Sequence, residues 1–367
     1  MNSFLHLSTR LLPSCLLGLL AGGFHPAAAG PSESGLVRIA EYPPHVYKGH
    51  SQVFQSVQGA DGVIYFTNYG AVLTWDGERW GRIPVPGAGF LYGIVALNDN
   101  RFAVCGVNTV AVIEPEGAGA FTSRSLAGEL PDVVRNDLGE VWDMAATPEG
   151  LFFFTRRHMI RWTPEGIRTW SFETKKTIYG FWTGSDIYVQ NLDDGLYRLD
   201  GDELRRVSEE PLFLSMGPRM MTDWTNDGIL VATAKDGLWL FDGQSLEPFP
   251  TDADSYLARN ILNKGLRLSD GRLAFGTFQG GLVVINEEGE FLRLVNEAAG
   301  LPNDTVTHLS QDRENGLWVS MGSGLARVEV DGLITYFDRS LGLPNVIVSG
   351  IHRHKGTIYA SSSEGLY

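Results

Sequence analysis

Cysteine and basic residues are scarce in this sequence, and each shortage excludes a class of protein. The 367 residues include two cysteines, Cys15 and Cys105, and Cys15 lies in an N-terminal segment that we expect to be removed. The mature chain then has no internal disulfide and no thiolate-rich metal site. The 43 Asp and Glu outnumber the 29 Lys and Arg, which gives a formal net charge of −14. Nucleic acid is a poor candidate for the main partner, because proteins that bind its phosphates concentrate Lys and Arg.

Long apolar segments are also missing, apart from one near the N-terminus. The apolar block at residues 11–21 follows Arg10 and precedes Ala27-Ala28-Ala29, which is the pattern of a signal peptide cleaved after Ala29. The block is too short to cross a bilayer, since a spanning helix needs about 20 residues. We therefore expect an exported protein that is periplasmic or secreted. The rest of the chain shows no sustained helical periodicity.

Glycine and aromatic residues are abundant. The 44 Gly residues and the 11% of Phe, Tyr and Trp are typical of an all-β protein with many tight turns. An acidic residue followed by Gly recurs at Gly separations of 40, 49, 35, 42, 46 and 43 residues, close to the length of a propeller blade. We predict a β-propeller of four-stranded antiparallel blades, about seven plus an incomplete eighth. The pairs expected to form the turn between the third and fourth strands are Asp76-Gly77, Glu116-Gly117, Glu165-Gly166, Asp200-Gly201, Asp242-Gly243, Glu288-Gly289 and Asp331-Gly332.

The best-preserved copy of the repeat spans residues 300–332. Short apolar runs at 306–309, 317–319 and 325–328 predict three strands, and the segment at 333–337 is expected to be the fourth. Asp312 and Trp318 could be taken for an active-site pair. We interpret them instead as turn and packing residues of the repeat.

The last copy begins at Gly342 and stops at Tyr367, inside its third strand. Two interpretations remain open, because an unfinished hairpin leaves a sheet edge without a partner. Either the sequence is a fragment of a longer protein, which we favour, or residues 36–40 supply an outer strand and close the ring. The expected organisation is a signal peptide at 1–29, a lead-in with a closing strand at 30–50, seven blades at 51–341 and a truncated blade at 342–367.

The best-preserved copy contains four short motifs in a fixed order: Gly300-Leu301-Pro302-Asn303, Asp312, Gly316-Leu317-Trp318-Val319 and Gly324-Leu325-Ala326-Arg327. With these motifs it resembles the two-component regulator propeller repeat, found in the periplasmic sensor regions of bacterial hybrid histidine kinases and sensor diguanylate cyclases. This resemblance implies a second propeller, a small β-sandwich, a membrane helix and an output kinase or cyclase domain beyond Tyr367. It implies that the exported chain is periplasmic, or the periplasmic part of an inner-membrane receptor.

Residues with catalytic or metal-binding chemistry are few. His352 and His354 lie on one face of a strand, but two ligands make an incomplete site, so we predict no metal and no cofactor. Cys105 follows an apolar run, and we expect a small buried strand residue and no nucleophile. Catalysis would require acids such as Glu140, Asp223 and Asp304 to converge in the central channel, which depends on the fold.

Propellers usually bind ligands on the face where the second-to-third and fourth-to-first strand loops surround the channel. Cationic and aromatic side chains in these loops would suit a small anionic or sugar-like ligand. The candidate ligand-binding residues are Tyr69, Arg156, Arg157, His158, Lys175, Lys176, Arg219, Lys235, Arg259 and Gln279.

The leading hypothesis is a non-catalytic sensor region that binds an extracellular ligand. Its expected partners are the downstream domains of the same receptor and a second copy of the chain in a homodimer. The alternative is a complete secreted propeller enzyme or carbohydrate-binding protein.

Overall fold

The structure is a computed structural model that describes residues 35–117, 119–215, 217–225, 228–332 and 334–367. The predicted signal peptide at 1–29 lies outside the described residues. The described chain divides into two units, one spanning Gly35–Asn345 and one at Val346–Tyr367. The two units are described separately below.

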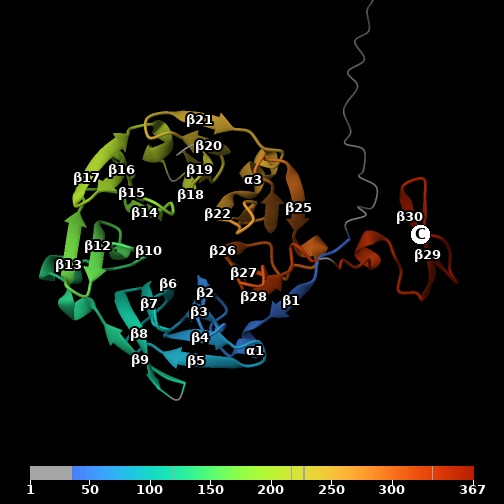
Figure 1. Ribbon diagram of the computed structural model, residues 1–367, viewed down its shortest axis with the longest axis horizontal. Coiled ribbons are helices and arrows are strands. Elements are labelled where there is room, and N and C mark those ends of the chain that lie inside the picture. The colour runs from blue at the N-terminus through green and yellow to red at the C-terminus, as the bar shows by residue number, and fades with distance from the viewer. Residues whose placement is uncertain (1–34, 118, 216, 226–227, 333) are drawn as a thin grey trace, which may run out of the picture. The chain divides into compact units, whose positions relative to one another are not determined.

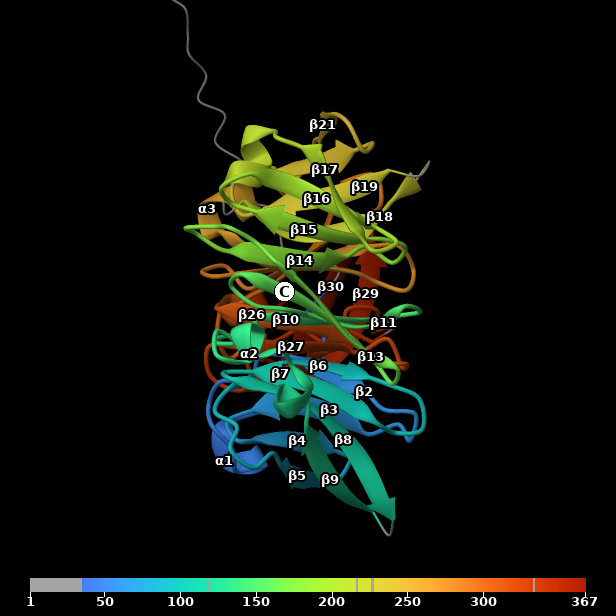
Figure 2. The ribbon, with the colours of Figure 1, turned by 90° about the vertical axis from the view of Figure 1, so that its left-hand side faces the viewer.

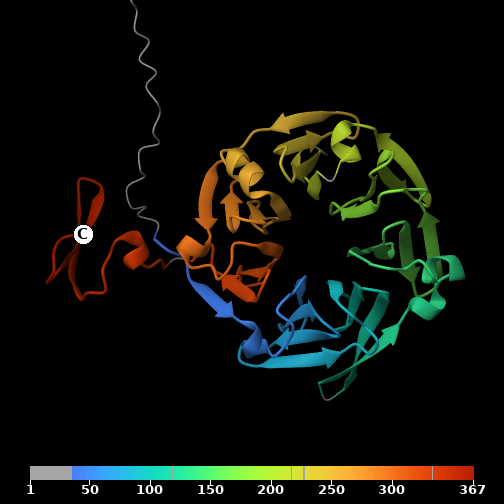
Figure 3. The ribbon, with the colours of Figure 1, turned by 180° about the vertical axis from the view of Figure 1, so that it is seen from behind.

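The larger unit is a ring of seven antiparallel sheets of four strands each, as predicted (Figure 1). In each sheet, or blade, the first strand lies nearest the centre and the fourth lies outermost, which is also clear from behind (Figure 3).

Six blades are formed by four consecutive strands. Blades 1 to 3 contain β2 (Ser56–Gln58), β3 (Ile64–Asn68), β4 (Ala71–Trp75) and β5 (Trp80–Pro84); β6 (Leu91–Ala96), β7 (Phe102–Gly106), β8 (Thr109–Gly117) and β9 (Ala120–Ser125); and β10 (Asp143–Thr147), β11 (Gly150–Phe154), β12 (His158–Thr163) and β13 (Gly166–Ser171). Blades 4 to 6 contain β14 (Ile178–Trp182), β15 (Ile187–Asn191), β16 (Gly195–Asp200) and β17 (Glu203–Ser208); β18 (Pro218–Asp223), β19 (Ile229–Thr233), β20 (Leu238–Phe241) and β21 (Leu246–Phe249); and β22 (Leu262–Arg267), β23 (Leu273–Thr277), β24 (Leu282–Ile285) and β25 (Phe291–Val295).

Blade 7 combines the two ends of the propeller. Its inner strands are β26 (Val306–Gln311), β27 (Leu317–Met321) and β28 (Leu325–Val328), and its outer strand is the N-terminal β1 (Ile39–Tyr42). Strand β1 runs antiparallel to β28, with Ile39 opposite Val328 and Tyr42 opposite Leu325.

The prediction that residues 333–337 form the fourth strand of this blade is wrong. The edge of β28 is occupied by β1, and Tyr336 makes a single bridge to Leu36. Val37, just before β1, is buried in the core cluster of this blade, so burial of apolar side chains favours the N-terminal strand. The predicted closing segment at 36–40 thus overlaps β1, but the strand closes a seventh blade and not an eighth.

The acidic-Gly pairs mark the turns well. In the first six pairs the Gly lies between the third and fourth strands or at the edge of one of them, and it takes a positive φ, for example 98° at Gly77 and 93° at Gly243. Glycine reaches this left-handed region without the steric penalty of a Cβ. Gly332 in the seventh pair is not in this region, and no fourth strand follows it.

The second strand of each blade lies in the core between neighbouring blades. All five residues are buried in β7, β19 and β27, for example, because these strands are covered by neighbouring blades on both faces. Cys105 lies in β7, is fully buried and has a pKa raised by that burial. It is the small buried strand residue that the sequence predicts.

Short helices lie at one face of the ring, which we call the helical face (Figure 2). They occupy connections from an outer strand to the next inner strand, and the second-to-third strand turns open on the same face. None of the helices in the described ranges is long and apolar enough to cross a membrane. The helices of these connections are α1 (Pro44–Tyr47), η1 (Ala127–Glu129), α2 (Asp132–Arg135), η2 (Pro211–Leu214), α3 (Asp254–Asn260) and η4 (Glu297–Ala299).

The chain continues after blade 7 through η5 (Arg339–Leu341). The C-terminal unit is a hairpin of β29 (Val348–His354) and β30 (Thr357–Ser362). Lys355 and Gly356 in its turn both have positive φ, 49° and 87°, as a two-residue type I′ hairpin turn requires.

Candidate ligand-binding site

The inner strands surround a central cavity of about 700 Å³. Every blade contributes lining residues from its first strand or from the residues just before it. One lining residue from each blade in order is Gln55, Tyr92, Asp143, Tyr179, Arg219, Lys264 and His308.

In four blades, a β-bulge in the first strand directs a side chain toward this cavity. In β6, β18, β22 and β26 the pairing with the next strand skips one residue, a β-bulge. The skipped residues are Tyr92, Arg219, Asn263 and Thr307, and all four line the cavity. A bulge leaves one residue out of the ladder and re-aims its side chain. The blades can therefore vary their channel residues at these positions without changing their pairing.

Aromatic rings lead across blades 1 and 2 to the cavity. We call Tyr69, Phe90, Phe54, Tyr92 and Trp142 the aromatic row. Successive ring centroids are 5.1, 5.7, 4.9 and 5.0 Å apart, and the last pair is stacked with an interplanar angle of 17°. Tyr69 and Trp142 at the ends are 53% and 43% exposed, so ring faces are available to a ligand.

The charges in the cavity come from three blades. Lys264 on β22 and Asp143 on β10 reach across the ring, with 3.9 Å between Nζ and Oδ2. Arg219 on β18 lies near Tyr179: burial raises the pKa of Tyr179, and the positive charge of Arg219 opposes that rise. The Nε of Arg219 is buried without a hydrogen-bond partner among the described residues.

His308 lies beside these charges on β26 and lines the same cavity. Burial, together with the positive charge of the nearby Lys264, lowers the pKa of His308 to about 3. The imidazole is therefore neutral at physiological pH, where it can donate or accept a hydrogen bond without adding charge.

Replacing His308 by Gln should flatten the pH dependence of stability. The pKa of a histidine in the unfolded chain is about 6.5, so the unfolded state takes up a proton as the pH falls from about 6.5 toward 3 and the folded state does not. Stability from the neutral form is present above pH 6.5 and declines below it, by at most about 1.4 kcal/mol per pH unit. Urea unfolding between pH 7 and 4.5 should show a shallower decline in His308→Gln. The exposed His45 offers a control in His45→Gln, and equal slopes in His308→Gln and the unmutated chain would contradict the expectation.

The structure places the residues predicted from the sequence on several blades. Arg156 contacts the loop of Lys175 and Lys176, because its guanidinium donates to their carbonyl oxygens at 3.4 and 2.9 Å. Arg219 lines the central cavity, and Tyr69 ends the aromatic row. The predicted residues that are exposed on the remaining connections are Lys235, Arg259 and Gln279.

Two predicted residues share a partner inside the protein. Arg157 and His158 both face Asp137, at 3.7 and 3.3 Å from its Oδ2. The other ring nitrogen of His158 lies 2.9 Å from the hydroxyl of Ser171, and His158 is 5% exposed. Its ring nitrogens are therefore engaged by protein groups.

The acids considered for catalysis do not converge. Neither Glu140, Asp223 nor Asp304 lines the central cavity. Glu140 accepts from the hydroxyl of Tyr92 at 3.4 Å, Asp223 accepts from a serine hydroxyl at 3.0 Å, and Asp304 accepts a backbone N–H at 2.7 Å. The residues that the sequence reasoning missed lie in the first strands, as Lys264 and His308 do, or just before them, as Phe54 and Trp142 do. Their position just after a fourth-to-first connection was the available signal.

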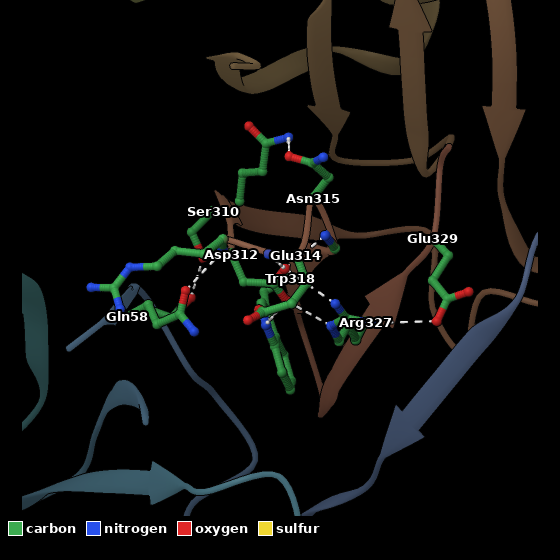
Figure 4. Close-up of polar contacts among 12 residues, drawn as sticks. Gln58, Ser310, Asp312, Glu314, Asn315, Trp318, Arg327 and Glu329 are labelled. Atoms are coloured by element: carbon green, nitrogen blue, oxygen red, sulfur yellow. Dashed lines mark hydrogen bonds and ion pairs between the residues drawn. The ribbon is translucent and has the colours of Figure 1, made fainter. Parts of the chain in front are cut away.

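The contacts in blade 7 explain why the repeat motif contains Asp312, Trp318 and Arg327 (Figure 4). Asp312 is buried, and its Oδ2 accepts from the indole of Trp318 at 3.0 Å and from Nε of Arg327 at 2.6 Å. Its Oδ1 accepts from the Gly316 N–H at 2.7 Å and from a second guanidinium nitrogen at 3.1 Å. A Cβ at Gly316 would lie 2.2 Å from the guanidinium of Arg327. Asp312, Gly316, Trp318 and Arg327 therefore require one another as a structural unit.

The segment that contains Asp312 and Trp318 matches a known family. Residues 300–323 match the family model described as "Two component regulator propeller". They form a two-component regulator propeller repeat. The resemblance expected from the sequence is confirmed, and the repeat supplies β26 and β27 of blade 7. No curated protein sequence matches the chain.

Solved structures share the propeller fold. A structure named as the extracellular domain of a hybrid two-component system from B. thetaiotaomicron has a TM-score of 0.66 and 14% identity, and covers 90% of this chain and 49% of its own. One named for a one-component system from the same organism has a TM-score of 0.60, 16% identity, and coverages of 90% and 45%. Virginiamycin B lyase from Staphylococcus aureus has a TM-score of 0.58, 12% identity, and coverages of 79% and 98%. At these identities the likeness is one of fold, and the chain spans about half the length of the first two.

Proposed function

We propose that this chain is the periplasmic sensor region of a bacterial signal-transduction receptor, and that it binds a small extracellular ligand in the central cavity without catalysis. The observation that carries the proposal is the cavity of about 700 Å³, to which all seven blades contribute side chains and at which the aromatic row ends. Pockets of this size with aromatic walls and a few polar groups are typical of small-molecule sites.

The comparisons support the receptor part of this proposal. Two similar structures are named as extracellular domains of signalling systems, and residues 300–323 of this chain match the two-component regulator propeller model. In a receptor of this kind, occupancy of the cavity would be passed to further domains of the same protein, or to a second copy of it. Ligand contacts with several blades at once give a physical route, because they favour one packing of the ring over another.

The chemistry of the cavity favours binding over catalysis. The carboxylate among the lining residues, Asp143, is paired with Lys264, and His308 has a pKa of about 3, too low for a proton shuttle near neutral pH. The similarity to virginiamycin B lyase, at 12% identity, is one of fold. It does not assign a catalytic group in this chain.

Replacing Trp142 by Ala should weaken ligand binding by about tenfold or more. Trp142 is exposed and stacked on Tyr92 at the cavity, and an aromatic anchor at the centre of an interface is often worth about 2 kcal/mol. Thermal shift against neutral and acidic mono- and disaccharides and small carboxylic acids would find compounds that stabilise the unmutated chain. Isothermal titration calorimetry on Trp142→Ala would then measure the loss.

The matched control is Phe291→Ala, which removes an exposed ring from the outer strand β25. It should bind as the unmutated chain does. Unchanged affinity in Trp142→Ala, or loss of affinity in both variants, would contradict binding at the cavity. Affinity that depends on Lys235, Arg259 or Gln279 would instead favour the loop residues of the helical face.

A further inference from the structure

The central cavity carries a positive charge in an acidic protein. Its charged lining residues are Arg219, Lys264 and Asp143, while His308 beside them is neutral near pH 7. The two cations outnumber the single carboxylate, although the whole chain has a formal net charge of −14. A local excess of positive charge inside a cavity attracts an anion.

The two cations have hydrogen-bonding capacity left over. A guanidinium has five N–H donors, and the buried Nε of Arg219 has no partner among the described residues. The Nζ of Lys264 lies 3.9 Å from the Oδ2 of Asp143, which is an ion pair but too long for a hydrogen bond. The Lys264 side chain is 40% exposed, so the cost of an unmet buried donor falls on Arg219, and an acceptor that reaches its guanidinium gains free energy.

Arg219 and Lys264 lie at adjacent points of neighbouring blades. Arg219 precedes Met220, and Lys264 precedes Gly265. Met220 and Gly265 are packed so closely that a Cβ on Gly265 would lie 2.6 Å from the Sδ of Met220. Lys264 also reaches Asp143, the residue next to Trp142. The ion pair thus brings Lys264 to the residue that follows Trp142, and both cations line the same cavity as the stacked rings of Tyr92 and Trp142.

We propose that the ligand carries a carboxylate attached to a ring with an apolar face, that Arg219 and Lys264 bind the carboxylate in place of Asp143, and that the ring face stacks on Trp142. This inference rests on the proposed function and narrows its ligand class. Arginine recognises carboxylates through paired N–H donors, and lysine adds a compact charge. A sugar acid and an aromatic acid both have this chemistry.

The test is calorimetric titration with two acids and their uncharged counterparts: glucuronate with glucose, and phenylacetate with phenylacetamide. We expect at least one acid to bind and its uncharged counterpart to bind at least about tenfold more weakly, since a hydrogen bond to a charged group is worth about 1.5–3 kcal/mol. Glucuronate alone would identify a sugar acid, and phenylacetate alone an aromatic acid. Affinity should fall as ionic strength rises.

Charge variants give the decisive comparison. Arg219→Gln and Lys264→Gln should each weaken binding of the acid about tenfold, whereas Asp143→Asn should strengthen it because the competing carboxylate is removed. Arg79→Gln makes the same charge change in the exposed turn between β4 and β5, outside the cavity, and should leave affinity unchanged. Circular dichroism would confirm that each variant is folded.

Three results would overturn the inference: neither acid binds, each acid binds no better than its counterpart, or Asp143→Asn weakens binding. Binding of glucose or phenylacetamide that Trp142→Ala abolishes would leave the proposed function standing while the anion site fails. Binding of an acid that neither Trp142→Ala nor the cavity charge variants affect would contradict both.

Discussion

A chain that begins at Pro43 is expected to be at least about 4 kcal/mol less stable than one that begins at Gly35, and to self-associate. The shorter chain lacks β1 and the two residues before it that are most buried, Leu36 at 8% and Val37 at 2% exposed. Full burial of such side chains contributes about 1.5–3 kcal/mol each. Without β1, the edge of β28 has unpaired backbone groups that can pair with another chain. Urea unfolding and multi-angle light scattering would measure both effects.

Two further chains separate loss of the strand from loss of chain length. Replacement of residues 36–42 by a Gly-Ser segment of equal length should be as destabilising as the truncation. A synthetic peptide of residues 35–43 added in excess should restore part of the stability by occupying β28. A truncated chain that stays monomeric and unfolds at the same urea concentration would show that β1 does not hold the ring closed.

Replacing Asp312 by Ala is expected to cost about 3–5 kcal/mol of unfolding free energy, the range for removing one partner of a buried ion pair. The carboxylate is buried and accepts from the Arg327 guanidinium, the Trp318 indole and backbone N–H groups. Its loss would leave Arg327, which is mostly buried, without its main counter-charge. Urea unfolding of the variant and of the unmutated chain would measure the difference.

The double variant Asp312→Ala with Arg327→Met should recover part of this loss, because no unpaired guanidinium remains. Asp242→Ala is the matched control. Asp242 also accepts two turn N–H groups, at 2.8 and 2.7 Å, but it is exposed, and its replacement should cost far less. Equal losses at Asp312 and Asp242 would show that burial of the ion pair adds nothing.

The regular part of the fold follows from local chemistry. Acidic-Gly pairs such as Asp76-Gly77 mark a turn whose backbone needs a positive φ, and that requirement is met within a few residues of chain. The prediction failed at Gly332 because the outer strand of blade 7 comes from the other end of the propeller. The sequence near residue 332 has no pattern that indicates that β1, from the other end of the propeller, pairs with the edge of β28.

The candidate site was less accessible to sequence reasoning. The hydrogen bond between Trp318 and Asp312 supports their interpretation as structural residues. This part could be predicted because both residue types belong to the repeat motif. The cavity residues Lys264 and His308 carry no motif. Their position just after a fourth-to-first connection indicates that they are near the channel, but their meeting depends on closure of the ring, which a single sequence does not show. The loop residues predicted to bind ligand, such as Lys235, stay a prediction.

The bulges in β6, β18, β22 and β26 also separate two demands on the sequence. Tyr92, Arg219, Asn263 and Thr307 are out of the strand ladder and line the cavity. Asn263 and Thr307 also donate to backbone carbonyls of the next blade, those of Val306 and Val53, so they help to close the ring. Tyr92 and Arg219 are the natural positions at which to diversify a library, because substitutions there change the wall of the channel while the strand pairs around them stay intact.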